Sequence, residues 1–62
     1  MRELKVGTMY WQKSCEKWLK YDGFGATQPG WHDFSENGKL YNQLRSNEVE
    51  QMFDFTKSYS EK

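Results

Sequence analysis

The chain has 62 residues, with nine basic and nine acidic side chains that leave no net charge. This length predicts a single domain over residues 1–62, and the neutral total argues against nonspecific duplex binding, which depends on neutralising phosphates. The one cysteine and one histidine exclude an internal disulfide and an ordinary structural zinc site, which takes four nitrogen or sulfur ligands.

Aromatic side chains dominate the apolar part of the composition. There are three Trp, four Tyr and four Phe residues, against four leucines, two valines, one alanine and no isoleucine. Each ring can bury about 150–250 Å², so a few rings fill the core of a chain this short. The remaining rings must be partly exposed, and exposed rings are common anchors of binding surfaces.

The first segment predicts a strand. Leu4, Val6, Thr8 and Tyr10 alternate with charged residues and a glycine, and this period of two is typical of a half-buried strand. The pattern can end at Gly7, because the residues that follow also fit a helix.

The second segment predicts a helix over roughly 9–21. Trp11, Cys15, Trp18 and Leu19 follow one another at the spacing of one helical stripe. Asp22-Gly23 supplies a stop, since glycine suits the left-handed residue beyond a helix C-terminus.

The stretch YDGFGATQPGW, residues 21–31, combines turn formers with three large rings. Glycine and proline indicate a loop over 22–30. We expect Trp31 to anchor this loop to the following hairpin and Tyr21 and Phe24 to be exposed. A core position for Phe24 is the equally weighted alternative.

Residues 31–44 predict a hairpin. Asn37-Gly38 is the favoured pair for a type I′ turn. A two-residue turn places Glu36 opposite Lys39, Phe34 opposite Tyr41 and Trp31 opposite Leu44. Favourable cross-strand pairs of this kind contribute about 0.2–1 kcal/mol each.

The last segment predicts a helix over 47–60. Asn47 suits an N-cap and Glu50 lies three residues later, as in a capping box. Val49, Met52 and Phe53 then follow on one stripe.

Together these elements predict an α+β fold. A three-stranded antiparallel sheet, made of the N-terminal strand and the 31–44 hairpin, packs with helices at about 9–21 and 47–60. An all-α fold is the alternative, because Leu40, Tyr41 and Leu44 also fit a helix and leave 39–45 ambiguous between strand and helix.

No residue pattern predicts catalysis, a metal site or a cofactor. His32 and Asp33 are neighbours in sequence, but neighbours on a strand point to opposite faces, so a polar strand position is the favoured interpretation. Cys15 lies on the predicted stripe and is expected to be a small buried side chain rather than a redox thiol.

We expect a non-enzymatic protein-binding module that acts stoichiometrically, as an inhibitor of phage type would act on a host protein. Its predicted partner-binding residues are Tyr21, Phe24, Trp31 and Tyr10, and the partner is another protein or a second copy of the chain. The alternative is a single-stranded nucleic-acid binder, because Lys13, Lys17 and Lys20 lie near Tyr10 and Tyr21 on the predicted helix.

The chain is expected to be cytoplasmic and not to enter a membrane. A lone cysteine favours a reducing compartment. The N-terminal residues lack the apolar run of a signal peptide, and no stretch approaches the ~20 apolar residues of a membrane span.

Overall fold

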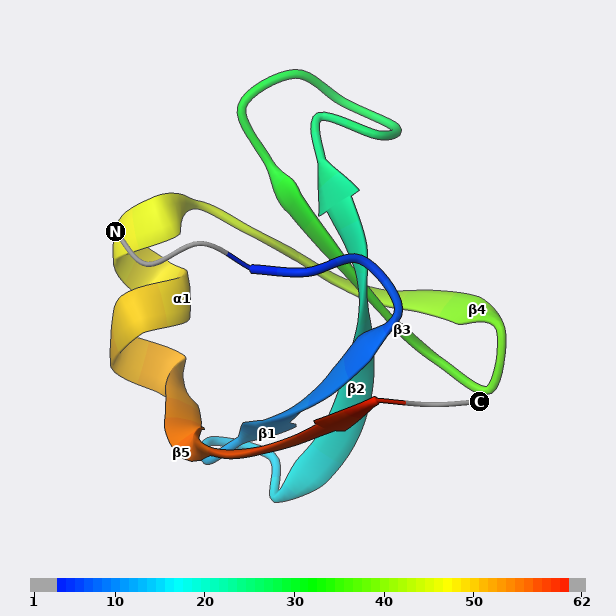
Figure 1. Ribbon diagram of the computed structural model, residues 1–62. Helices are drawn as coiled ribbons and strands as arrows, with labels where there is room; N and C mark the ends of the chain where they lie inside the picture. Colours follow the sequence, from blue (N-terminus) through cyan, green and yellow to red (C-terminus); the bar gives the residue numbers. More distant parts are fainter. Residues whose placement is uncertain (1–3, 61–62) are drawn as a thin grey trace.

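A computed structural model describes residues 4–60 (Figure 1). The described residues form one five-stranded antiparallel sheet and one short helix. In chain order the elements are β1 (Thr8–Gln12), β2 (Lys17–Phe24), β3 (His32–Glu36), β4 (Lys39–Leu44), α1 (Ser46–Met52) and β5 (Phe53–Ser60).

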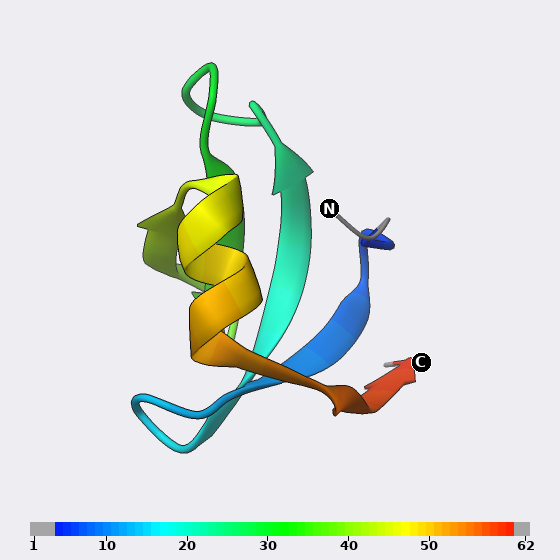
Figure 2. The same ribbon diagram turned by 90° about the vertical axis from the view of Figure 1, so that its left-hand side faces the viewer.

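The sheet is a four-stranded meander with β5 added at one edge. The strand order is β4-β3-β2-β1-β5. Helix α1 carries the chain from the β4 edge across to the β1 edge, where β5 pairs antiparallel with β1. The sheet is strongly curved, and α1 lies in its concave side (Figures 1 and 2).

The predicted α+β fold with a three-stranded sheet and two helices is wrong, and so is the all-α alternative. The segment predicted as helix 9–21 is β1, a turn and β2, which form an antiparallel pair. Trp11 and Trp18 are directly opposite each other in this pair, so both occupy one face of the sheet. Glu16, with a φ of 53°, lies in the connecting turn. The i, i+7 spacing of the two tryptophans therefore fits a hairpin as well as a helical stripe.

The 31–44 hairpin is confirmed, with a change of register. Asn37 and Gly38 have φ values of 53° and 81°, as a type I′ turn requires. Glu36 pairs with Lys39 as expected, but Phe34 pairs with Asn42 instead of Tyr41, and Leu44 pairs with His32 instead of Trp31. The register shifts in this part of the ladder, so Tyr41 has no partner on β3. The ambiguous residues 39–45 are mainly strand, since β4 ends at Leu44.

The predicted helix over 47–60 is correct only for its first part. Helix α1 has seven residues, and its N-cap is Arg45 instead of Asn47. The Glu48 carboxylate accepts a hydrogen bond from the Arg45 backbone N–H at 3.0 Å. This contact gives the N-cap N–H a partner at the start of the helix. From Phe53 onwards the chain is strand β5, which pairs with β1, whereas a longer helix would leave the backbone of the β1 edge unpaired.

The core lies between the concave side of the sheet and α1. Four of its seven buried hydrophobic residues are aromatic, which is consistent with the scarcity of aliphatic residues in the sequence. The rings of Phe34 and Phe53 stack with their centroids 4.5 Å apart. The buried set is Tyr10, Leu19, Tyr21, Phe34, Leu44, Val49 and Phe53.

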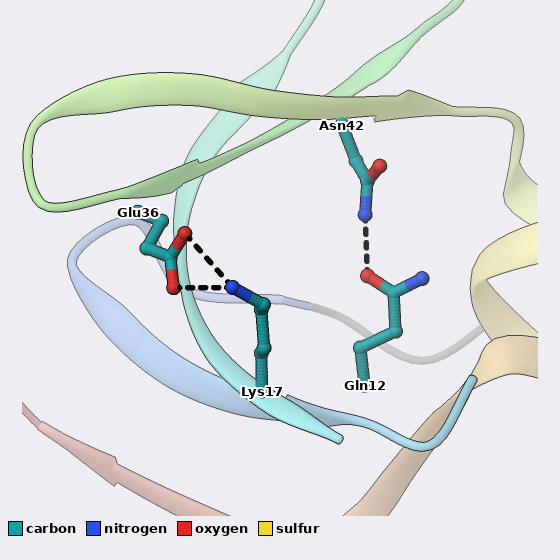
Figure 3. A network of polar contacts seen from close by, with 4 residues as sticks. All are labelled: Gln12, Lys17, Glu36 and Asn42. Atoms are coloured by element: carbon teal, nitrogen blue, oxygen red, sulfur yellow. Dashed lines mark hydrogen bonds and ion pairs between the residues drawn. The ribbon is translucent and has the colours of Figure 1, made fainter. Parts of the chain in front are cut away.

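Polar side chains connect strands that are not neighbours in the sheet. The Asn42 amide on β4 donates a hydrogen bond to the Gln12 amide oxygen on β1 (Figure 3). The Gln12 amide in turn donates to the Ser14 hydroxyl at 2.7 Å. Because β4 and β1 are separated by two strands in the sheet order, this contact holds the curved sheet closed beside α1.

Candidate functional site

Two of the four predicted partner-binding residues are in the core. Tyr10 is 8% exposed and Tyr21 is 4% exposed, so the expectation of an exposed Tyr21 is wrong. The strand β2 turns alternate residues inward, and Tyr21 follows Leu19 on the inner side. Neither ring is available to a partner on the surface of the folded chain.

The other two predicted residues, Phe24 and Trp31, lie at the two ends of the 25–30 loop. Phe24 is 60% exposed, with its ring centroid 4.6 Å from that of His32. Trp31 is half-buried, and the Arg45 guanidinium lies 4.6 Å from its ring centroid. Whether these two side chains bind a partner stays a prediction.

The loop between them is exposed but well anchored. Its ends are joined by a hydrogen bond from the Gly25 N–H to the Trp31 carbonyl at 2.8 Å. The Thr27 hydroxyl donates to the buried Asp33 carboxylate at 2.8 Å, and the Gln43 amide donates to the same carboxylate at 3.1 Å. These hydrogen bonds therefore hold the loop in place next to Phe24, the last residue of β2.

The three lysines proposed for nucleic-acid binding do not lie on one helix face. They were grouped by the helical spacing of 9–21, which the chain does not adopt. Lys13 lies in the β1–β2 turn, whereas Lys17 and Lys20 lie on β2 and both line the groove described below. The Lys17 ammonium is bonded to the Glu36 carboxylate at 3.1 Å (Figure 3), and this contact raises the pKa of Lys17.

An aromatic cluster occupies the outer face of the sheet, the face turned away from α1. We call Met9, Trp11, Trp18 and Tyr59 the outer aromatic patch. The ring centroids of Trp11 and Trp18 are 5.4 Å apart and those of Trp18 and Tyr59 are 4.7 Å apart, both edge to face. The Lys57 ammonium lies 5.2 Å from the Trp11 centroid. Tyr59 is 48% exposed and the other three side chains are half-buried.

The sequence analysis missed this patch because it assigned Trp11 and Trp18 to a buried helical stripe. The signal that locates them is the pairing of two short strands across the 13–16 turn, which places both indoles on one face. Tyr59 joins them because β5 pairs with β1 in a register that sets Tyr59 opposite Met9.

A groove of about 370 Å³ opens beside the patch. Met9, Trp18 and Tyr59 form its apolar side. Its polar side comes from Lys17, Lys20, Ser35 and Glu36, and the Asn37–Gly38 turn closes one end. The volume is near the small end of the ~300–1,000 Å³ range of ligand sites, which suits one or two side chains of a partner.

His32, at the start of β3, forms a chain of hydrogen bonds with two hydroxyl groups. Its Nδ1 is 2.8 Å from the Tyr21 hydroxyl and its Nε2 is 2.9 Å from the Ser46 hydroxyl. Burial lowers the pKa of His32 and raises that of Tyr21, so both are neutral at pH 7. Both ring nitrogens of His32 are therefore hydrogen-bonded to hydroxyl groups, and the tautomer decides which partner donates. This arrangement joins β2, β3 and α1.

Cys15 is half-buried in the β1–β2 turn, so its predicted place on a buried helical stripe is wrong. Among residues 4–60, no group of three His, Cys, Asp or Glu side chains is arranged to hold a metal ion. Within the same residues, no helix has the length and hydropathy needed to cross a bilayer.

Comparisons with protein-family models, with curated proteins and with solved structures find no match to the chain. The proposals that follow therefore depend on the geometry of the fold.

Proposed function

We propose that the chain is a non-enzymatic module that binds a partner protein stoichiometrically through the outer aromatic patch and the adjoining groove. One observation carries the proposal. The solvent side of an antiparallel sheet is ordinarily polar, but here Trp18 contacts both Trp11 and Tyr59 edge to face, and Met9 lines the groove with Trp18 and Tyr59. Contiguous exposed apolar surface on a small domain marks an interaction site.

A protein partner fits this surface better than a single-stranded nucleic acid does. Stacking on bases needs rings with open faces beside a continuous basic track. Here the patch rings meet edge to face, and the Lys57 ammonium lies over Trp11. The Lys17 ammonium is bonded to Glu36 within the groove lining.

The partner is expected to cover the outer face instead of extending the sheet. The free edges of a sheet can accept a further strand, but bulges and lysines oppose this. Strand β4 has a bulge at Tyr41 and begins at Lys39. The β1–β5 ladder skips three β5 residues between Asp54 and Ser58, and Lys57 is one of them.

Peptide display with a matched pair of tyrosine variants tests the proposal. Linear peptides of about twelve residues are selected on the immobilised protein, and their affinities are measured by fluorescence polarisation. Tyr59→Ser should weaken binding at least tenfold, since it removes an exposed ring from the patch. Tyr41→Ser is the control, because Tyr41 is 42% exposed but does not line the groove.

Two results would contradict the proposal. One is a set of selected peptides whose affinity is unchanged by Tyr59→Ser and lost with Phe24→Ser, which would move the site to the 25–30 loop. The other is the absence of any selected peptide, together with binding of a twelve-residue oligothymidylate that falls steeply between 50 and 200 mM salt. That salt dependence would assign the surface to nucleic acid.

A further inference from the structure

The turn between β3 and β4 joins an asparagine to a glycine, a pair of residues that can react without a catalyst. The side-chain carbon Cγ of Asn37 can close a five-membered ring with the backbone nitrogen of Gly38, and Gly38 has no side chain to hinder the approach. Both residues are exposed, and even a Cβ added at Gly38 would meet nothing within 4 Å. The reacting atoms are therefore open to water and free of steric obstruction.

The observed turn holds these atoms apart, but one rotation brings them together. With φ values of 53° and 81°, Asn37 and Gly38 form a type I′ turn, in which the first central residue has a ψ of about 30°. Ring closure requires Cβ of Asn37 to eclipse the Gly38 nitrogen. An L-residue does this at a ψ of about −120°, the value of the same position in a type II′ turn.

The hairpin tolerates this rotation. Types I′ and II′ both match the twist of two paired strands, and they differ by a flip of the central peptide. The flip changes the sign of the Gly38 φ, which glycine allows at little cost. Asn37 is less favourable in the flipped turn, because this position of type II′ prefers glycine. The flipped turn is therefore a minor state that the chain reaches while Glu36 and Lys39 stay paired.

We propose that Asn37 deamidates spontaneously in the folded protein through this flipped turn. The Gly38 nitrogen gives its proton to a solvent base and bonds to Cγ of Asn37, while the Cγ–Nδ2 bond breaks and ammonia leaves. Water then opens the resulting cyclic imide. Cleavage of the nitrogen–Cγ bond gives aspartate, and cleavage of the bond to the backbone carbonyl carbon gives isoaspartate. The sum consumes one water and releases one ammonia, with no oxidation or reduction.

The two products affect the turn differently. The aspartyl product keeps the normal backbone, and Asp-Gly is also a favoured type I′ pair. The isoaspartyl product routes the main chain through Cβ and Cγ, which adds one carbon atom to the turn. Glu36 and Lys39 cannot then keep their present pairing. Because Asn37 and Gly38 line the groove, the isoaspartyl form opens that end of it.

Peptide mapping of the incubated protein tests the proposal, because the chain contains its own controls. The three asparagines, Asn37, Asn42 and Asn47, fall on three different tryptic peptides. Asn42 precedes Gln43 in β4, and Asn47 is exposed but precedes Glu48 in α1. After incubation in mildly alkaline buffer, mass spectrometry should detect conversion of amide to acid at Asn37 at least tenfold faster than at the other two. A rate at Asn37 no higher than at Asn47 would overturn the proposal.

Urea below the unfolding transition separates reaction in the folded state from reaction of unfolded molecules. The free energy of unfolding falls linearly with urea, so the unfolded fraction rises exponentially. Deamidation through the flipped turn should keep one rate over this range and increase only when the chain unfolds. A rate at Asn37 that follows the unfolded fraction would overturn the proposal, and so would the absence of deamidation in native buffer.

Hydrogen exchange tests the effect on the turn. The products separate by chromatography, with Asn37→Asp as the marker for the aspartyl product and Asn37→Gly as the variant that cannot react. The isoaspartyl form should exchange the Lys39 amide hydrogen at least tenfold faster than Asn37→Asp, since Lys39 pairs with Glu36 across the turn. Equal exchange in the two forms would contradict the opened turn.

Only the effect on binding rests on the proposed function. Peptides selected on the wild-type protein should bind the isoaspartyl form at least tenfold more weakly and should bind Asn37→Asp with little change. Faster Lys39 exchange with unchanged peptide affinity would contradict binding in the groove, and with it the proposed function, while the modification would stand.

Discussion

At the scale of single residues, the protonation of His32 couples the stability of the fold to pH. It is the one histidine of the chain and is 5% exposed, between Tyr21 and Ser46. Burial disfavours the imidazolium and lowers the pKa of His32 below its ordinary value of 6.5, although the Asp33 carboxylate opposes this shift. The unfolded chain therefore takes up this proton at a higher pH than the folded chain.

We predict that the protein loses stability as the pH falls below about 6.5. A group whose pKa is lowered by folding adds stability above its unfolded pKa, and this stability is lost as the pH falls through the folded pKa. The free energy of unfolding, measured in urea at intervals from pH 7.5 to pH 5, should decrease over this range. His32→Gln should flatten the profile in the same interval. An equal decrease in the variant would show that other groups cause it.

At the scale of secondary-structure elements, the 31–44 hairpin was predictable because its turn has a specific chemical requirement. Asn37 and Gly38 adopt positive φ, as that turn type demands. The bulge at Tyr41 was not predictable from the turn, and beyond it the Asn42 amide bonds Gln12 on the distant β1 strand.

The helix predicted for 9–21 shows why periodicity alone failed. Residues spaced by seven lie on one helical face, but they are also cross-strand partners when the intervening residues turn back. Trp11 and Trp18 satisfy both conditions, and only pairing with the rest of the sheet selects the strands. The same holds for 53–60, where the free edge of β1 selects a strand.

We predict that Gly38→Ala destabilises the hairpin by about 1–2 kcal/mol, the cost of a left-handed backbone for a residue with a Cβ. A Cβ at this position meets nothing within 4 Å, so the loss measures backbone conformation and not a clash. Urea unfolding gives the value. Asn37→Gly is the control and should retain the turn, because glycine adopts the required φ. An unchanged free energy for Gly38→Ala would mean that the turn is not of this type.

At the scale of the whole molecule, the surplus of aromatic residues was predictable and its location was not. The sequence indicated more rings than one small core can hold, and the structure divides them between a core around Phe34 and an outer face around Trp18. The exposed position of Phe24 was one of two equally weighted expectations, whereas Tyr10 and Tyr21, both predicted to bind a partner, are buried. Which rings are buried depends on which face of each strand meets α1. That face can be identified only when the pairing of all five strands is known.

The three tryptophans give the most direct test of the claim that the outer face is the binding surface. Trp11 and Trp18 belong to the outer aromatic patch, while Trp31 lies beside the 25–30 loop under Arg45. Each indole N–H gives its own resonance in a ¹⁵N-correlated NMR spectrum. Titration with a peptide selected on the wild-type protein should shift the Trp11 and Trp18 signals and leave that of Trp31 in place. A shift of Trp31, with Trp11 and Trp18 unchanged, would contradict the account.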